Sequence, residues 1–324
     1  MNKARTNYTY MLNQLWESIK NNGGILIALG IMGLGLSFGT KHFLTSANLQ
    51  NVFNYFTTNC VLAFCMMSCL ITGEIDLSIS SLIALSGIML CMMLNAGLSL
   101  LVALPITLLI GAAVGLFTGL VIAFSGMPSF IVTLAMQGVI RGFAYIISEG
   151  ERISSTDETF FNLANGRVWG IPIPTIIMVV VAFLLYLLLK RTIMGKHMYA
   201  SGGNREAAVY SGIKVKKIVS ITFAISGALA CLAGAFVASR VTSGQPTAGV
   251  GYEGDAVAAA VLGGTAFTGG RGTVIGTILG ALVIGVLTNG LNLLEVSYYW
   301  QLVAKGLIIM LAVLIDTIKQ RKSA

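Results

Sequence analysis

The chain has 324 residues, of which 56% are hydrophobic and 10% are charged, and its mean hydropathy is +0.86. A soluble domain carries about 25% charged residues, so this composition excludes a soluble globular protein and predicts an all-α integral membrane protein. The net charge of +8 does not indicate nucleic-acid binding, because the basic residues are spread over a few loops and both termini without interleaved aromatic residues.

Ten segments of the chain are apolar enough to be interpreted as membrane spans, each of which needs about 20 mostly apolar residues. They are 23–39, 52–72, 78–95, 99–124, 128–148, 171–189, 218–239, 255–268, 273–293 and 299–316. The segment 255–268 is short and rich in Gly and Ala, so a broken or tilted helix is expected there. The ten segments are expected to form one transmembrane domain over residues 1–324.

The polar stretch Lys190–Lys217 fixes the expected orientation. It carries seven basic residues against one acid, Glu206, and Lys and Arg near the ends of spans stay on the cytoplasmic side. Six predicted spans precede this stretch and four follow it, so both termini are expected in the cytoplasm. The segments 40–51, 149–170 and 240–254 are then expected outside. The net acidic segment 149–170 suits either a lid or docking surface, or a solvated connector.

Arg141 is the one basic residue well inside a predicted span. Counted from Pro128 at 1.5 Å per residue, it lies about 20 Å along its helix, past the middle of a core roughly 30 Å thick. Placing a charge there costs about 2.5–3.5 kcal/mol on the translocon scale. Two interpretations follow: Arg141 lines or gates a polar pathway, or it is a structural anchor bonded to backbone carbonyls.

Two ridges of small residues inside the spans predict close helix packing, with a subunit interface as the alternative. The ridges are Gly111, Gly115 and Gly119, and Gly276, Gly280 and Ala281. The glycine-rich stretch Gly263–Gly272 permits backbone with positive φ, which predicts a sharp cytoplasmic hairpin. Asn289 and Asn292 lie near the outer end of a span, where amides either bond across helices or contact a sugar hydroxyl.

Residues for catalysis or for metal binding are not found in a usable pattern. The chain has no GxxxxGK[ST] phosphate loop, so it is not expected to hydrolyse ATP. It has no Ser/His/acid set, its two histidines lie far apart, and its five cysteines lie inside apolar runs without a CxxC pair. We therefore expect no enzyme activity, no metal and no cofactor in this chain.

Four stretches, in order along the chain, resemble signature motifs of the ribose/xylose/galactoside class of ATP-binding-cassette sugar permeases. They are Gly73–Ser81 (GEIDLSISS), Pro128–Leu134 followed by Arg141-Gly142 (PSFIVTL…RG), Tyr199–Ala208 with Ser211–Ile213 (YASGGNREAA…SGI), and the glycine-rich run 256–276. One such motif would be a weak signal, whereas four in order cover most of the chain.

The resemblance implies a multi-pass permease subunit of a bacterial importer in the cytoplasmic (inner) membrane, surrounded by membrane lipid. It implies an extracytoplasmic binding protein that delivers a monosaccharide, a pentose or a hexose, to a dimer of permeases, built from two copies or from two related chains. It also implies a separate cytoplasmic ATP-binding-cassette ATPase, which carries the ATP and Mg. A partner nucleic acid is not implied.

On this resemblance, the cytoplasmic loop couples the permease to the ATPase, and Arg205–Tyr210 is expected to form a short helix. The coupling residues are Gly195, Gly202, Gly203, Asn204, Arg205, Glu206, Ala207, Ala208 and Gly212. The candidates for the translocation pathway are Arg141, Asn289, Asn292, Glu74 and Asp76.

Two departures from the family pattern leave the exact sugar open: Glu74 replaces the second Gly of GGIDLS, and Gly254 replaces the apolar residue before Asp255. Two alternatives remain at this stage. One is an importer permease for branched-chain amino acids or nucleosides. The other is an ion-coupled secondary transporter, which would need ionisable residues deep in the membrane, whereas Glu74 and Asp76 lie at the edge of a span.

Overall fold

The computed structural model describes residues 23–323, and over these residues the chain is a bundle of helices with four two-residue strands. Six helices are long and apolar enough to cross a membrane. They are α3 (Ser46–Ile71), α5 (Leu100–Ser125), α6 (Ser129–Ser148), α8 (Ile173–Arg191), α11 (Val215–Arg240) and α13 (Val274–Leu293). The predicted all-α membrane fold is confirmed at this coarser level.

Each of the other four predicted spans also contains a helix, but these helices do not all meet the length of a full span. They are α2 (Gly23–Gly39), α4 (Ile79–Asn95), α12 (Tyr252–Leu262) and α14 (Tyr298–Ser323). The 11 residues of α12 extend only about 16 Å, half the thickness of the membrane core. The expected short helix near 255–268 is therefore present, and it begins and ends earlier than predicted. The predicted cytoplasmic N-terminus, before residue 23, lies outside the described residues.

The predicted outside segment 40–51 is shorter in the structure, because α3 already begins at Ser46. The hydroxyl of Thr45 accepts a hydrogen bond from the Asn48 amide at 3.3 Å and so caps the first turn of α3. Cap residues of this type satisfy backbone N–H groups that have no partner inside the helix.

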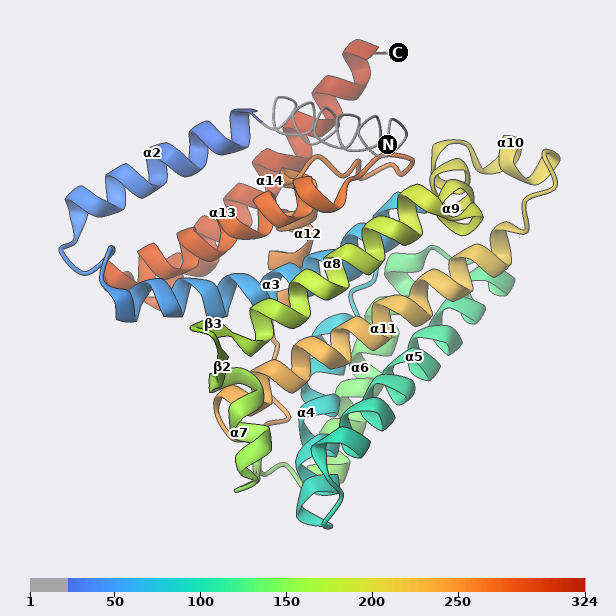
Figure 1. Ribbon diagram of the computed structural model, residues 1–324. Coiled ribbons are helices and arrows are strands. Elements are labelled where there is room, and N and C mark those ends of the chain that lie inside the picture. Colours follow the sequence, from blue (N-terminus) through green and yellow to red (C-terminus); the bar gives the residue numbers. More distant parts are fainter. Residues whose placement is uncertain (1–22, 324) are drawn as a thin grey trace, which may run out of the picture.

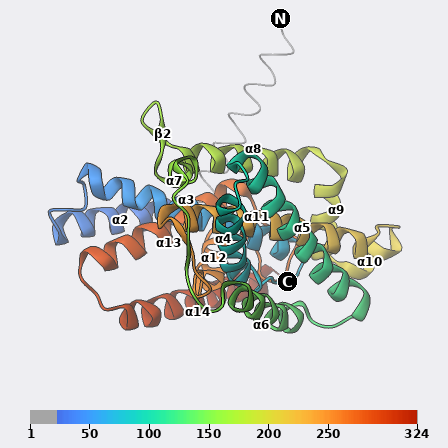
Figure 2. The same ribbon diagram turned by 90° about the horizontal axis from the view of Figure 1, so that it is seen from below.

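Helix α3 is the central element of the bundle. It packs against α8, α11, α12 and α13, and 89% of its most apolar 18-residue window is buried inside the protein. The views in Figures 1 and 2 place α2 and α13 on one side of the bundle and α5 on the other. In contrast, only 22% of the corresponding window of α5 is buried, so α5 presents a largely apolar surface outward, as a lipid-facing helix does.

Helices α5 and α11 approach each other closely along the predicted glycine ridge. A Cβ atom added at Gly115 would lie 2.1 Å from the carbonyl oxygen of Phe223, and one added at Gly111 would lie 2.5 Å from that of Gly227. The second ridge behaves in the same way, because a Cβ at Gly280 would lie 2.0 Å from the Ala259 oxygen of α12. Both ridges therefore pack helices within this chain.

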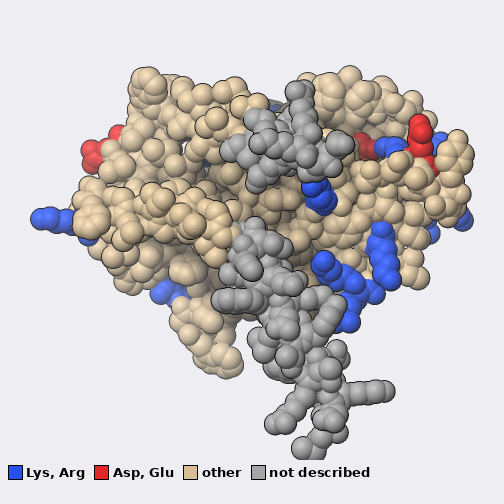
Figure 3. All heavy atoms as spheres, turned by 90° about the horizontal axis from the view of Figure 1, so that it is seen from above, with Lys and Arg blue, Asp and Glu red and all other residues tan. Residues whose placement is uncertain are grey.

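The two ends of the bundle carry different small elements. Helices α9 (Ile193–Gly203) and α10 (Arg205–Tyr210) lie at one end, and α7 (Glu158–Asn165) lies at the opposite end, as Figure 1 shows. Near α7, strands β2 (Arg167–Val168) and β3 (Ile171–Pro172) form an antiparallel pair. Strand β1 (Ile153–Ser154) pairs with the distant β4 (Ser243–Gly244). Figure 3 shows a face made mostly of uncharged residues, with its charged side chains toward the left edge and over the right half.

Candidate functional site

The predicted coupling loop folds into the two short helices α9 and α10. Helix α9 is capped by Thr192, whose hydroxyl accepts from the Gly195 amide at 3.1 Å. Helix α10 is capped by Asn204, whose side-chain oxygen accepts from the Ala207 amide at 2.9 Å. The helix expected at Arg205–Tyr210 is confirmed with the same bounds. Its Ala208 is buried, whereas Tyr210 is 89% exposed, so α10 is an anchored helix with an open face.

Helix α9 is fastened to the end of α3 through glycine backbone. A Cβ at Gly202 would lie 2.0 Å from the carbonyl oxygen of Ile71, and the same oxygen accepts a hydrogen bond from the Gly270 amide at 3.0 Å. Gly269, with a φ of +96°, lies against Gly202. We call this meeting of Ile71, Gly202, Gly269 and Gly270 the α9 junction. It joins two of the four sequence motifs to the end of α3 in one backbone contact.

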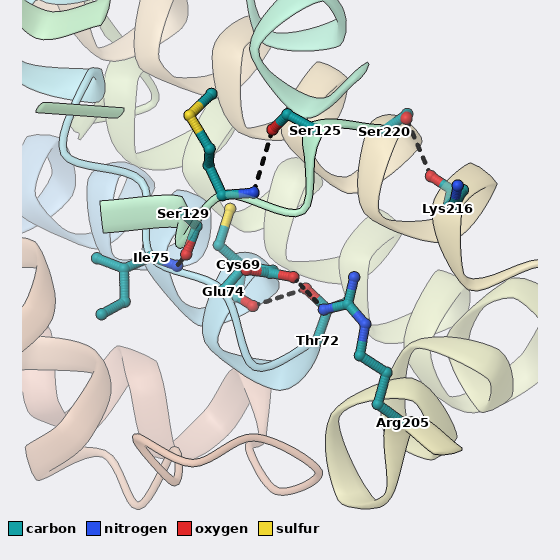
Figure 4. A network of polar contacts seen from close by, with 10 residues as sticks. Cys69, Thr72, Glu74, Ile75, Ser125, Ser129, Arg205, Lys216 and Ser220 are labelled. Atoms are coloured by element: carbon teal, nitrogen blue, oxygen red, sulfur yellow. Dashed lines mark hydrogen bonds and ion pairs between the residues drawn. The ribbon is translucent and has the colours of Figure 1, made fainter. Parts of the chain in front are cut away.

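An ion pair adds a side-chain link to the α9 junction. Arg205 reaches from α10 to Glu74, and its Nη1 lies 2.6 Å from the Glu74 carboxylate, as the close view in Figure 4 shows. The Glu74 side chain is 7% exposed and that of Arg205 is 51% exposed. The Glu74 amide donates to the carbonyl of Cys69 at 3.0 Å, which fixes the turn that carries the carboxylate. The acid that departs from the family pattern is thus the partner of Arg205, one of the predicted coupling residues.

A second link at the same end comes from Tyr199 of α9, whose hydroxyl donates to the Gly272 carbonyl at 2.8 Å. Burial raises the pKa of Tyr199 to about 12, because the phenolate would lose its hydration there. The side chain is therefore a neutral donor throughout the physiological range. The predicted hairpin Gly263–Gly272 is confirmed as a turn-rich segment, with positive φ at Gly264, Gly269 and Gly270.

Residues 74–78 form an extended segment that enters the bundle between α3 and α4. The Ile75 amide donates to the Ser129 hydroxyl at 3.0 Å, at the start of α6. Both carboxylate oxygens of Asp76 are occupied: one accepts from the amide and hydroxyl of Ser78, and the other accepts from the Ser226 hydroxyl of α11 at 2.7 Å. Asp76 therefore caps the entry to α4 and ties it to α11.

The depth of this segment follows from its bonds to α6. The Gln137 amide donates to the Ser80 hydroxyl at 2.9 Å, and Gln137 lies about 12 Å along α6 from Ser129. Since the 20 residues of α6 extend about 30 Å, α4 begins well inside the membrane core. The span predicted over residues 78–95 therefore does not start at the membrane surface. Non-helical backbone leads into the membrane core before α4 begins.

Arg141 binds three backbone carbonyls at that depth. Its Nη1 donates to the oxygens of Pro246 and Ala248, both at 2.6 Å, and its Nη2 donates to Ser80 at 3.1 Å. These contacts agree with the second interpretation of the sequence, in which Arg141 is a structural anchor bonded to backbone carbonyls.

The partners of Arg141 reveal that residues 241–251 are not a simple surface loop. Gly244 packs against Gly87 and Ile88 of α4, and Gly249 lies against Ser80 and Ile83 at the start of that helix. The segment therefore descends along α4 from the end that carries α7 toward mid-membrane, where α12 begins. We call residues 241–251 the re-entrant loop. The segment 240–254 was expected to lie outside the membrane, and this expectation is corrected: most of it enters the bundle along α4.

The two predicted asparagines lie elsewhere. Asn289 of α13 and Asn48 of α3 exchange two hydrogen bonds, at 2.8 and 3.0 Å. The exposed Asn292 accepts from the Gln301 amide at 2.9 Å. The structure thus does not gather the predicted pathway residues at one site: Glu74 lies at the α9 junction, Asp76 bonds Ser78 and α11, and Arg141 lies deeper, against residues 246–248. The asparagines lie at a separate helix contact.

Sequence reasoning missed two features of this region. One is the re-entrant loop, whose signal is the run of Gly244, Pro246, Gly249 and Gly251 before an apolar stretch too short to span. The other is the ion pair of Lys305 in α14 and Asp255 in α12, with 2.7 Å between nitrogen and oxygen. Over residues 23–323, no group of three or more His, Cys, Asp and Glu side chains suits a metal ion.

Comparison with known proteins shows extensive similarity to permeases. Residues 48–313 match the family described as branched-chain amino acid transport system / permease component. The chain is 41% identical to the ribose import permease protein RbsC of Haemophilus influenzae, over 90% of this chain and 91% of that protein. It is 40% identical to the ribose import permease protein RbsC of Bacillus subtilis, over 95% and 96% of the two chains. It is 35% identical to the D-allose transport system permease protein AlsC of Escherichia coli, over 93% and 92%. No solved structure matched the chain.

Proposed function

This chain belongs to the branched-chain amino acid transport system / permease component family, and on that premise we propose that it is the membrane subunit of an ATP-driven importer for a pentose or hexose. The observation that carries the proposal is its identity of 40–41% to two ribose import permeases over at least nine-tenths of each chain. The chain is a transport component, and its relatives are named as permeases.

The choice of a sugar over a branched-chain amino acid rests on the relatives and on the motifs. The family description names amino acids, whereas the relatives that align over nearly the whole chain are named for ribose and D-allose. The GEIDLS and GGN motifs agree with the sugar branch. The departure at Glu74 does not alter this choice, because Glu74 is paired with Arg205 and belongs to the α9 junction.

The open face of α10 supports a role as the docking surface for a cytoplasmic ATPase. Lys and Arg concentrate in residues 190–217, which supports a cytoplasmic location for this end of the bundle. Val209 and Tyr210 are 56% and 89% exposed there, and exposed apolar side chains on an anchored helix suit a protein partner. Movement of α10 would reach α3 through the α9 junction and through the Arg205–Glu74 pair. ATP and Mg would bind to the ATPase.

The opposite end supports docking of an extracytoplasmic sugar-binding protein. There, α7 and the paired strands β2 and β3 form a small ordered surface with Trp169 97% exposed. Strand β1 of this surface pairs with β4 of the re-entrant loop, so a partner on this surface would act directly on that loop. A second permease copy, identical or related, would complete the importer.

The experiment is reconstitution of this chain with an ATP-binding-cassette ATPase and a sugar-binding protein from the same organism. We expect ATP-dependent uptake of at least one of ribose, D-allose and L-arabinose into vesicles, and no uptake when ATP or the ATPase is omitted. Sugar uptake without the ATPase would contradict the proposal, as would uptake of leucine in preference to every sugar tested.

A further inference from the structure

A small cavity lies against the re-entrant loop, and neither the sequence motifs nor the comparisons assign it a role. Its volume is about 150 Å3, well below the roughly 300–1,000 Å3 of pockets that take drug-sized ligands. It lies between α4, the last turn of α11, the loop itself and the first residue of α12. The polar side chains in its lining are those of Ser243, Gln245 and Tyr252.

The cavity lies where two helices begin inside the membrane. Helix α4 starts at Ile79 and α12 starts at Tyr252, and the contact of Gly249 with Ser80 and Ile83 brings these two starts together. Non-helical backbone at membrane depth is tolerated only where it is buried in protein or lines a cavity. In membrane transporters, such interrupted helices mark the place where the solute binds.

The lining chemistry selects a neutral, hydroxylated solute. The described lining residues include none with a charged side chain, so an amino acid zwitterion would lack side-chain counter-charges there. A sugar needs hydrogen-bond partners and apolar contact, and both are present: the Gln245 amide and the Ser243 hydroxyl face the same cavity as Ile83 and Val237. The Tyr252 ring adds an apolar surface with a polar tip.

Arg141 acts here as a positioning residue. Arg141 does not line the cavity, but its guanidinium donates to the carbonyls of Pro246 and Ala248 in the re-entrant loop. Ala248 itself lines the cavity. The arginine therefore fixes the wall of the cavity without placing its charge in the solute's way.

We propose that this cavity is a transit subsite for the sugar, in which Gln245 and Tyr252 contact the solute while it passes through the permease. The proposal rests on the proposed function, since it takes the cargo to be a monosaccharide. It adds a location for the solute and two contact residues.

The test is labelling of a Gln245→Cys variant in the complete importer with a small methanethiosulfonate reagent. The five native cysteines are at most 2% exposed, so the unsubstituted importer reports the background. We expect a transported sugar to slow labelling of the introduced thiol by about fivefold or more, and we expect the labelled importer to lose uptake. The matched control is Thr247→Cys, in the same loop but exposed and outside the cavity lining, where the sugar should not slow labelling.

A second variant keeps the test decisive if Gln245→Cys assembles poorly. Gln245→Ala should raise the KM for uptake by about tenfold, as the loss of one hydrogen bond does, and an unchanged KM would overturn the subsite. Equal labelling with and without sugar, or full uptake after labelling, in an importer that does take up sugar would overturn the subsite alone. An unsubstituted importer that takes up none of the sugars would overturn the proposed function and the subsite with it.

Discussion

Arg205 and Arg141 each fasten non-helical backbone to the surrounding helices, but Arg205 does so through a carboxylate and Arg141 through backbone carbonyls. Arg205 is half exposed, and it forms an ion pair with Glu74. Arg141 lies inside a membrane helix and donates to three carbonyls. The Arg205 pair can open toward water at modest cost, because water replaces its bonds. The Arg141 bonds have no such replacement at membrane depth.

This difference assigns different mechanical roles to the two regions. The α9 junction lies at the surface beside the exposed helix α10, so a partner can push on it and the ion pair can part and reform. The re-entrant loop is held rigidly by Arg141 and pairs through β4 with the opposite end of the protein. We therefore expect changes at Arg141 to affect folding and uptake together, and changes at Arg205 to affect mainly the coupling of ATP hydrolysis to uptake.

The largest effect is expected for Arg141→Ala. The carbonyls of Pro246 and Ala248 would lose their arginine partner, and each buried unsatisfied carbonyl costs about 1–3 kcal/mol, so the variant should be about 2–6 kcal/mol less stable. The measurement is the thermal midpoint of the purified protein in detergent together with uptake. The exposed Arg152→Ala is the control. Normal stability with lost uptake would instead favour the pathway interpretation of Arg141.

A smaller effect is expected for Gly202→Val, which tests the α9 junction without removing any charge. The new Cβ would lie 2.0 Å from the Ile71 oxygen, and overpacking of this kind costs about 1–3 kcal/mol. We expect α9 to move away from α3, so that uptake falls to about a tenth or less while ATPase binding persists. Gly138→Ala, where an added Cβ meets no atom within 4 Å, should be harmless. Full uptake in Gly202→Val would show that the junction does not transmit movement.

The Arg205–Glu74 pair predicts an asymmetry between its two single variants. Arg205→Gln leaves a carboxylate that is 7% exposed without its partner, whereas Glu74→Gln leaves an arginine that is already 51% exposed. The first should therefore be more destabilising, and a double-mutant cycle should give a coupling energy of about 1–2 kcal/mol, between the values for exposed and buried pairs. Both variants should hydrolyse ATP with less sugar carried per ATP than the wild type. The control is Arg191→Gln, on an exposed arginine at the same end. Equal effects of Arg205→Gln and Glu74→Gln on stability and coupling would contradict the model of a pair that opens.

The sequence predicted those parts of the fold and site that depend on local signals. Apolar runs located the helices, and the cytoplasmic loop with its resemblance to a permease motif located α10. The structure shows the local cause, since the Asn204 side chain caps the first turn of α10. The close packing of Gly111 and Gly115 was also predicted, since small residues have few other uses inside a membrane.

The remaining features depend on contacts between distant residues. Glu74 and Arg205 are 131 positions apart, and no local pattern marks them as partners. The re-entrant loop has the composition of a surface connector, and only the bonds from Arg141, more than 100 residues away, place it at membrane depth. The cavity follows from that placement, so it could not be predicted from the sequence.

The smallest effect lies outside both arginine sites, at the N-terminus of α7. The Asp157 carboxylate accepts from the Thr159 hydroxyl at 2.5 Å and from the Phe160 amide at 2.8 Å, and these bonds lower its pKa below the ordinary value of 3.8. The contribution of the Asp157 cap to stability is therefore complete at pH values above 3.8, and it is lost as the pH falls through the lowered pKa. Asp157→Ala should cost about 1 kcal/mol, which would appear as roughly fivefold faster hydrogen exchange of the α7 amides at neutral pH. Glu158→Gln, at an exposed neighbour in the same turn, should exchange as the wild type does. If Asp157→Ala also slowed sugar uptake, movement of α7 would reach the re-entrant loop through the β1–β4 pair, and the loop would be less rigid than its three bonds to Arg141 imply.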